Sequence, residues 1–437
     1  MKQTEVGLIP DDWEVKNIID VLIPSKDNLK IGPFGSQLKK DYLLDNGIYK
    51  VFGQDNIYTS DFKYCYRFLT KEHFQKLQSC ELKAGDFVIS TMGTIGKCDI
   101  VPENAGVGIM DSHLVRLRLS SYIDKVFFKH FFQSEIIQKQ ISALSVGGIM
   151  DGLSATIIRK LNVIFLPKQE QQRIAKALSD VDAVISTTEK LIQKKKNIKQ
   201  GTMQELLTGK KRLPNFATTT ATKQTELGEI PADWEVKTLG ELCSLITKQT
   251  GFDYSATIKP SLVLEHKNNT LPFIQNKDFE EEKINFNTDF YIPVEIAKRF
   301  PKIYLNEDVL LISISGRIGN VAYFKHTQDA FIGGAVGIAH FYNKHIINYC
   351  MRYLLSPNGQ KQIFANEKSG AQHNLTIADV RKLSIPMPTN NKEQTAIANV
   401  LSSMDKEIET LNTKLEKYRN LKTAMMQQLL TGKIRLK

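Results

Sequence analysis

The chain has 437 residues, of which 42% are hydrophobic and 24% are charged, a composition that is typical of globular domains and excludes fibrous and disordered proteins. No apolar stretch approaches the roughly 18 residues that a transmembrane helix needs, and the N-terminus MKQTEVGLIPDDW lacks the apolar core of a signal peptide. We therefore expect a cytoplasmic protein that has no membrane partner.

Charge and cysteine content narrow the class further. The net charge of +11 suggests a polyanionic partner. Nine of the eleven excess positive charges lie in residues 169–215 and 392–437, so the remaining regions are nearly neutral. The five cysteines are odd in number, widely spaced and without a C-x-x-C pair, which favours reduced thiols over a disulfide framework or a zinc site.

The sequence contains one long internal repeat. Residues 2–16 (KQTEVGLIPDDWEVK) and 223–237 (KQTELGEIPADWEVK) share twelve of fifteen residues, and each segment holds one of the two tryptophans. The halves also close alike, because MQELLTGKKRL at 203–213 matches MQQLLTGKIRL at 426–436 in nine of eleven positions. The repeat unit therefore spans about half of the protein, and the two halves are expected to share one fold.

Between these ends the similarity is weaker but keeps its order. Phe52-x-Gln54 is matched to Phe273-x-Gln275, and the glycine-flanked G-T-I-G at 93–96 is matched to G-R-I-G at 316–319. Residues 24–85 and 246–307, in contrast, barely resemble each other. We infer that two similar scaffolds carry two different surfaces.

The predicted elements follow the same order in each half. Short β-rich runs such as DFVIST at 86–91 and VLLISIS at 309–315 precede a short helix, near residues 122–141 and 346–365, and then a long amphipathic segment. The long segments, 169–208 and 393–431, contain no proline and close in Leu-Leu-Thr-Gly, and the second one has heptad spacing.

We therefore expect an α+β protein with two mixed α/β domains in pseudo-twofold tandem repeat, separated by two long antiparallel coiled-coil helices. The expected domain boundaries are residues 1–168 for the first domain, 169–213 for the first long helix, 214–222 for a linker, 223–391 for the second domain and 392–437 for the second long helix.

The sequence contains no catalytic motif that has all the residues its chemistry needs. Gly96-Lys97 lacks the leading glycine and the hydroxyl residue of a phosphate-binding loop, and Glu81-x-Lys83 is too short a match to indicate a nuclease. The sequence has no paired histidines of the H-x-x-x-H type, no nucleophile elbow and no dinucleotide fingerprint. We therefore predict no catalytic residue, no metal ligand and no cofactor site in this chain.

The repeated opening G-x-I-P-x-D-W-E-V, the variable region, the long helix and the Leu-Leu-Thr-Gly-Lys close together resemble the specificity subunit of type I restriction-modification systems. The opening lies at 7–15 and 228–236, and further similar stretches are GPFGSQL at 32–38, SGRIGN at 315–320 and SGAQHNL at 369–375. This resemblance covers the whole chain.

The resemblance implies a DNA-binding subunit without catalysis, in which two target recognition domains each read one half of a split, asymmetric sequence in double-stranded DNA. It also implies that the paired helices hold these domains apart and dock two methyltransferase subunits, which carry S-adenosylmethionine and methylate adenine. A restriction subunit is an optional further partner. Because different surfaces on one scaffold should bind different half-sites, the repeat itself agrees with an asymmetric target.

The residues that contact DNA should combine groups that reach base edges with groups that hold phosphates. In the first half the candidates are Ser36, Gln37, Lys39, Lys40, Gln54, Thr91, Thr94 and Lys97. In the second half they are Lys248, Gln249, Tyr254, Gln275, Lys277, Arg317, Asn320, Gln372 and His373. The alternative for each glycine-flanked residue is a turn that satisfies its own backbone.

Two other functions remain open from the sequence. One is a self-contained DNA methyltransferase or nuclease, which the missing cofactor motif disfavours. The other is a coiled-coil scaffold that never binds DNA, which predicts no sequence-selective DNA binding even when partner subunits are present.

Overall fold

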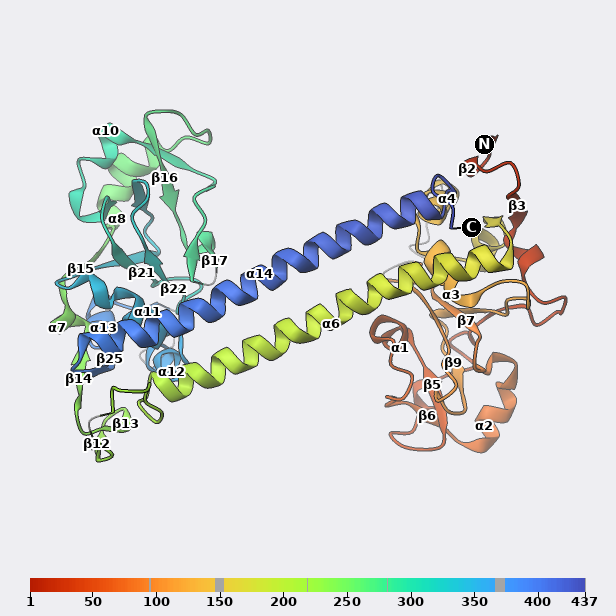
Figure 1. The fold of residues 1–437 in the computed structure, drawn as a ribbon, viewed down its shortest axis with the longest axis horizontal. Helices are drawn as coiled ribbons and strands as arrows, with labels where there is room; N and C mark the ends of the chain where they lie inside the picture. The colour runs from red at the N-terminus through yellow and green to blue at the C-terminus, as the bar shows by residue number, and fades with distance from the viewer. Residues whose placement is uncertain (94–95, 146–152, 218, 281, 366–373, 437) are drawn as a thin grey trace. The chain divides into compact units, whose positions relative to one another are not determined.

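The computed structural model describes residues 1–93, 96–145, 153–217, 219–280, 282–365 and 374–436, which form two compact units (Figure 1). Unit 1 consists of residues 1–189 and 413–437, and unit 2 consists of residues 190–412. The two longest helices, α6 (Lys168–Leu206) and α14 (Asn391–Leu429), each begin in one unit and end in the other.

Unit 1 contains two principal sheets. Their strands are β4 (Leu29–Ile31), β10 (Leu114–Leu117), β7 (Phe87–Ser90) and β8 (Cys98–Ile100) in a four-stranded antiparallel sheet, and β6 (Phe68–Leu69), β5 (Tyr49–Phe52) and β9 (Gly108–Met110) in a three-stranded sheet. Strands β5 and β9 run parallel. The two-stranded pairs are β1 (Lys2–Thr4) with β2 (Gly7–Ile9), and β3 (Glu14–Asn17) with β11 (Asn162–Phe165).

The helices of unit 1 are short apart from the two long ones. The α-helices are α1 (Gln54–Thr59), α2 (Lys71–Lys76), α3 (Lys125–Phe132), α4 (Glu135–Ser145) and α5 (Ala155–Ile158), and the 3-10 helices are η1 (Ile18–Val21), η2 (Lys40–Tyr42) and η3 (Gln78–Cys80).

Unit 2 repeats this arrangement. Its larger sheets are β15 (Cys243–Lys248), β24 (Val336–Phe341), β21 (Val309–Ser313) and β22 (Val321–Phe324), then β19 (Tyr291–Pro293), β16 (Thr270–Ile274), β23 (Ala330–Ile332) and β20 (Tyr304–Leu305). The two-stranded pairs are β12 (Thr222–Thr225) with β13 (Gly228–Pro231), β14 (Trp234–Thr238) with β25 (Ser384–Pro388), and β17 (Phe279–Glu280) with β18 (Lys283–Ile284).

The other helices of unit 2 include one irregular segment in which α8 (Gly251–Asp253), η4 (Tyr254–Ile258) and α9 (Lys259–Ser261) follow one another directly. The rest are α7 (Leu239–Leu242), η5 (Asn276–Asp278), α10 (Val294–Ala297), η6 (Pro301–Ile303), η7 (Lys344–Ile346), α11 (Ile347–Leu355), α12 (Pro357–Ala365) and α13 (Ile377–Arg381).

The strand orders β4-β10-β7-β8 and β15-β24-β21-β22 are the same, and each unit also has a parallel pair, β5 with β9 or β16 with β23. The expected α+β tandem repeat is therefore confirmed. One predicted detail is wrong: the helix expected near 122–141 is two helices, α3 and α4, and that near 346–365 is α11 and α12. In the second case Pro357 begins the new helix, because proline cannot donate within a continuing one.

Strand β7, one of the two inner strands of the four-stranded sheet of unit 1, is buried on both faces. In β7, Phe87 and Ile89 belong to the apolar cluster that contains Trp13, whereas Val88 belongs to a second cluster around Phe52. Successive side chains of a strand point to opposite faces, so one short run of apolar residues serves two cores. This is why β7 reads as a continuous hydrophobic stretch and not as an alternating one.

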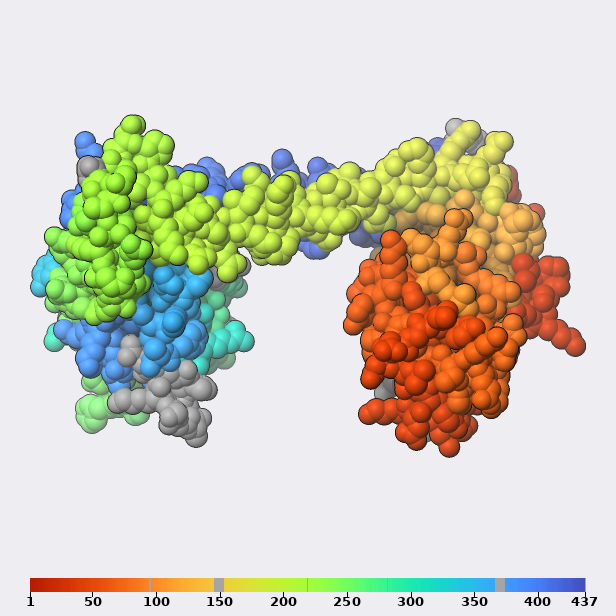
Figure 2. All heavy atoms as spheres, turned by 90° about the horizontal axis from the view of Figure 1, so that it is seen from below, coloured from red at the N-terminus to blue at the C-terminus, as the bar shows by residue number. Residues whose placement is uncertain are grey.

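The long helices run antiparallel within each unit. In unit 1, Asp182 pairs with Lys422 at 2.6 Å and Glu189 with Arg419 at 2.8 Å. In unit 2, Lys195 pairs with Glu407 at 2.7 Å. Residues further along α6 therefore pair with residues earlier in α14, as expected for antiparallel helices. Helix α6 is continuous over 39 residues and is visible as the yellow-green band of spheres in Figure 2.

A buried tryptophan closes each unit against the end of a long helix. In unit 1 the Arg435 guanidinium lies 5.2 Å from the centre of the Trp13 ring. It also binds Glu170 at 2.5 Å and Asp12 at 2.8 Å. The Trp13 indole N–H donates to Glu170 at 3.2 Å.

Unit 2 has an equivalent junction, although the Trp234 indole N–H has no hydrogen-bond partner in the described part of the chain. Arg212 lies 5.4 Å from the centre of the Trp234 ring and binds Glu393 at 2.5 Å and Asp233 at 2.9 Å. Both tryptophans have no exposed surface. The repeated Pro-x-Asp-Trp and Leu-Leu-Thr-Gly-Lys-x-Arg motifs are therefore the two sides of one contact.

The glycine after each long helix is required by this contact. Gly209 and Gly432 have φ of +72° and +68°, the left-handed region that ends many helices. A Cβ atom at Gly432 would lie 2.3 Å from Pro10, and one at Gly209 would lie 2.4 Å from Pro231. Only glycine satisfies both the conformation and the close approach.

A second pair of equivalent clusters lies beside the long helices. In unit 2 the buried Arg352 contacts Glu282 and Asp405, and Lys199 contacts the same two carboxylates. Burial lowers the pKa of Lys199, but hydrogen bonds to Asp405 and Glu282 more than reverse this and raise it. Four charges from α6, α14, α11 and the β17–β18 turn therefore neutralise one another.

In unit 1 the repeat places His130 at the position of Arg352, next to the Asp182–Lys422 pair. His130 is buried, and this burial, reinforced by Lys422, lowers its pKa to about 4. The cluster of unit 1 thus holds a neutral ring where that of unit 2 holds a cation.

All five cysteines are free thiols, and four of them are buried. Burial raises the pKa of Cys98 and Cys243 to about 12, so these thiols stay protonated and unreactive at neutral pH. Over the residues that the structure describes, no helix combines the length and apolar character needed to span a bilayer.

The glycine contact predicts the effect of a single methyl group. We expect Gly432→Ala to destabilise unit 1 by about 1–3 kcal/mol, because alanine is strained in the left-handed region and its Cβ meets Pro10. Gly201→Ala is the matched control: Gly201 lies within α6 with no atom near its Cβ position, and alanine there should stabilise the helix by about 0.5–1 kcal/mol. Denaturant unfolding measures both changes, and equal midpoints would contradict the contact.

His130 predicts a pH dependence of stability. Its folded pKa lies below its unfolded value, so the unfolded state binds the proton more readily and stability falls as pH decreases from about 6.5 to about 4. His130→Phe should remove this component, worth about 3 kcal/mol across the window. The exposed His345→Gln variant is the control and should keep the slope of the unmodified protein in urea unfolding at each pH. A His130→Phe protein with an unchanged slope would show that His130 is not buried as a neutral ring.

Candidate DNA-binding edge

In unit 1 the ends of four strands from both principal sheets meet at one edge. After β4 the Gly32 N–H donates to Leu114 O at 2.9 Å, and Leu114 pairs with Ser90, the last residue of β7. After β9 the Asp111 N–H donates to Phe52 O, the end of β5, at 2.9 Å. We call this the strand-end edge. It collects several of the residues that the sequence singled out.

Gln54 joins the two sheets at this edge. Its amide nitrogen donates to Ser90 Oγ at 2.6 Å and to Met92 O at 2.5 Å, and the Tyr58 hydroxyl donates to the same carbonyl at 3.2 Å. The side chain is therefore occupied in positioning the turn after β7. Tyr58 was not among the residues that the sequence suggested, because it becomes adjacent only when α1 packs on β7.

The turn after β7 has the same geometry as the turn after β21. Gly93 and Gly96 have φ of +66° and +78°, and Gly316 and Gly319 have φ of +74° and +89°. The Ser90 N–H donates to Lys97 O at 2.8 Å, and Ser313 N–H donates to Asn320 O at 2.9 Å. The G-x-I-G match is thus confirmed, and both Lys97 and Arg317 lie exposed on these turns. Thr94 lies outside the described residues.

Strand register corrects the other internal match. Phe52 pairs with Met110 in unit 1, and Ile274 pairs with Ile332 in unit 2. Phe52 is therefore equivalent to Ile274 and not to Phe273, so the match of Phe52-x-Gln54 to Phe273-x-Gln275 is wrong by one residue. The sequence could not show this, because the two segments share too few residues to fix an alignment.

The counterpart of Gln54 is consequently Asn276, which the sequence analysis missed. Its amide donates to Ser315 O at 2.5 Å, and it accepts from the Asn320 amide at 3.3 Å. Gln275 instead precedes η5, where its N–H donates to Asp278 at 2.7 Å. Burial raises the pKa of Asp278, against the opposing effect of this hydrogen bond.

The remaining candidates of unit 1 lie along the same edge. Ser36, Gln37, Lys39 and Lys40 are exposed in the segment that follows β4. Thr91 is buried, and its hydroxyl donates to His113 O at 3.0 Å. Four of these five side chains are thus open to solvent, and Thr91 has a structural partner.

The remaining candidates of unit 2 are less uniform. Lys248 is exposed at the end of β15, Tyr254 packs beside an apolar cluster, and Lys277 forms an ion pair with Asp289. Gln372 and His373 lie outside the described residues. The edge of unit 2 therefore offers Lys248, Gln275, Arg317 and Asn320 as candidate polar contacts.

The edges of the two units differ in side-chain size at the residue that directly follows β4 or β15. In unit 1 a Cβ at Gly32 would collide with Asp111 O at 1.7 Å, whereas Gln249 occupies the corresponding place beside Gly334 in unit 2. Gln249 is 3% exposed, and neither its amide nitrogen nor its amide oxygen has a hydrogen-bond partner in the described part of the chain. The edges of the two units thus differ in their interior as well as at their surface.

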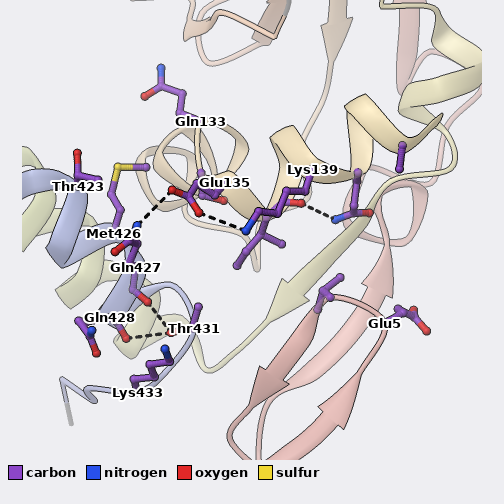
Figure 3. A pocket seen from close by; sticks show the side chains of 15 residues that line it. Glu5, Gln133, Glu135, Lys139, Thr423, Met426, Gln427, Gln428, Thr431 and Lys433 are labelled. Atoms are coloured by element: carbon purple, nitrogen blue, oxygen red, sulfur yellow. Dashed lines mark hydrogen bonds and ion pairs between the residues drawn. The ribbon is translucent and has the colours of Figure 1, made fainter. Parts of the chain in front are cut away.

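A cavity of about 650 Å³ lies elsewhere in unit 1, between α4, the end of α14 and the β1–β2 hairpin (Figure 3). Its wall mixes apolar and polar groups, and the polar ones bind each other: Gln427 on α14 donates to Glu135 at 3.2 Å, and Glu135 pairs with Lys139 at 3.4 Å. None of the candidate DNA-contacting residues lines it. Within the described residues, no cluster of histidine, cysteine, aspartate and glutamate could hold a metal ion.

Comparison with known proteins identifies the class of this architecture. The family profile for the type I restriction modification DNA specificity domain matches residues 10–200 and 231–417. The chain is 30% identical, over 460 aligned residues, to the MjaX protein of Methanocaldococcus jannaschii, which is named as a type I restriction enzyme specificity subunit; the match covers 100% of this chain and 97% of that one. The MjaVIII specificity subunit of the same organism is 28% identical over 76% of this chain and 75% of its own.

Two solved structures share the fold. The type I restriction-modification S subunit of Mycoplasma genitalium has a TM-score of 0.54 and 15% identity, with 98% of both chains covered. A chain from a structure that describes the assembly and conformational transition of a type I system has a TM-score of 0.57 and 16% identity, with 98% of this chain and 99% of that one covered.

Proposed function

The chain belongs to the family of type I restriction-modification DNA specificity proteins, and we propose that it is the non-catalytic subunit that recognises DNA in such a complex. In this proposal each unit reads one half of a bipartite, asymmetric target in double-stranded DNA. The strand-end edges contact the DNA, through their exposed amide, hydroxyl and cationic side chains.

One observation carries this proposal: the two units have the same strand order, yet different side chains lie at equivalent places on their edges. Gln54 in unit 1 corresponds to Asn276 in unit 2, and Lys97 corresponds to Asn320. Identical edges on a repeated scaffold would favour a palindromic target, whereas different edges favour two unlike half-sites.

Partner docking is assigned to the long helices. Three exposed apolar residues of α6, Val184, Leu191 and Ile198, recur every seven residues, which is the spacing of a helix-binding stripe. Leu421 of α14 is also exposed and is equivalent to Ile198. The equivalents of Val184 and Leu191 on α14 are the charged residues Glu407 and Lys414, so the exposed apolar stripe itself is not repeated. We infer from the repeated ends of the long helices that the chain docks two adenine methyltransferase subunits, which would carry S-adenosylmethionine, and a restriction subunit would join where the system retains one.

The alternatives make different predictions. A self-contained methyltransferase would transfer methyl groups from S-adenosylmethionine without a partner. A coiled-coil scaffold would show no sequence-selective DNA binding with its partners present. We expect the purified chain to methylate nothing alone and to support methylation at one bipartite sequence when two methyltransferase subunits are bound, as measured by native mass and by mapping methylated adenines.

Modularity of the two units gives the sharper test. Replacing residues 17–165 with the corresponding region of a related specificity subunit should change one half of the methylated sequence and leave the other unchanged, because the exchange keeps Trp13 and the long helices. Exchange of residues 238–388 is the reciprocal control. If either exchange altered both half-sites, the units would not read DNA independently.

A further inference from the structure

A phenylalanine projects from the equivalent loop of each unit. Phe34 is 67% exposed and follows the end of β4 by three residues, and Phe252 is 81% exposed and follows the end of β15 by four residues. The two strand ends, Ile31 and Lys248, occupy the same register position on the neighbouring strands β10 and β24. The two aromatic residues therefore follow equivalent strand ends, at the corresponding corner of the four-stranded sheet in each unit.

This equivalence is not a by-product of overall similarity. The surrounding segments, 24–85 and 246–307, are the least similar parts of the two halves, and the loops fold differently, as an open turn in unit 1 and a short helical segment in unit 2. Each phenylalanine has a glycine neighbour, Gly35 or Gly251, with no atom within 4 Å of its Cβ position. The space beside each phenylalanine is therefore open at the neighbouring glycine.

A phenylalanine whose surface stays mostly exposed contributes little to the stability of the folded chain. Single exposed apolar residues are common and need no explanation. Two in equivalent loops, one residue apart when counted from the strand ends and each at the edge assigned to DNA, do need one. The same edges carry exposed amides and cations such as Gln37 and Lys248, which suit base edges and phosphates.

We propose that Phe34 and Phe252 are wedges that stack into a base step of duplex DNA, one in each half-site. This inference rests on the proposed function. Proteins that insert apolar side chains between base pairs unstack and bend the duplex locally, and an enzyme that modifies adenine must take the base out of the stack. A wedge in each half-site would weaken stacking beside the adenine that a bound methyltransferase extracts.

The test uses the complex of the full chain with its methyltransferase partner and duplexes that carry 2-aminopurine at single positions of either half-site. We expect Phe34→Ala to abolish the rise in 2-aminopurine fluorescence in one half-site and Phe252→Ala to abolish it in the other. Affinity should fall about tenfold in each case, as for the loss of one stacked base. Phe34→Trp and Phe252→Trp should retain the signal.

The matched control is Tyr342→Ala. Tyr342 is 75% exposed and follows Phe341 at the opposite end of β24 from the strand-end edge, which lies at Val336. Its removal should leave fluorescence and affinity unchanged. A second readout separates a wedge from a base contact: a mismatch opposite the target adenine, which is already poorly stacked, should restore methylation by the Phe34→Ala and Phe252→Ala complexes.

Three results would overturn the inference. Unchanged fluorescence in both alanine variants, with selective binding intact, would refute the wedge and leave the proposed function standing. Loss of the methyltransferase subunit from the alanine variants in the absence of DNA would show that the rings contact the protein partner. Absence of selective binding by the unmodified complex would contradict the proposed function and, with it, the wedge.

Discussion

Each unit is held together at its junction with a long helix by one contact, in which the glycine turn that ends the helix packs against a buried tryptophan. Trp13 packs against Gly432 and Arg435, which lie in the second half of the sequence. Trp234 packs against Gly209, which lies in the first half. Each half of the repeat therefore supplies the last segment of the other unit. This exchange explains why the ends of the repeat are the most similar parts, since each end must fit a partner segment of the same shape.

The sequence predicts this frame well because its requirements are local. Glycine in a left-handed turn, tryptophan beside proline and an amphipathic helix without proline each leave a clear pattern. The candidate site is harder to predict, because its geometry depends on register between distant strands. The equivalence of Gln54 with Asn276 follows from strand pairing, and no local pattern in these short strands shows it. The burial of Gln249 likewise depends on the glycines of a loop more than eighty residues away.

A shared frame with variable edges is consistent with the proposal that the two units read unlike DNA sequences. The four-stranded sheet and its two cores are kept in both units, while the residues that follow the strand ends differ. Substitution at such an edge changes few buried contacts, so recognition can diverge at little cost in stability. The clusters beside the helices differ as well, with Arg352 in one unit and neutral His130 in the other, so the two units are expected to respond differently to acid.

The exchange of end segments is tested most directly by removing residues 426–437 and following amide hydrogen exchange. This truncation deletes Gly432 and Arg435, which belong to unit 1, and leaves the Trp234 junction of unit 2 intact. The account predicts that protection is lost in residues 9–17 and 162–174 and is unchanged in residues 229–238 and 384–398. Equal loss of protection in both regions, or unchanged protection around Trp13, would contradict it.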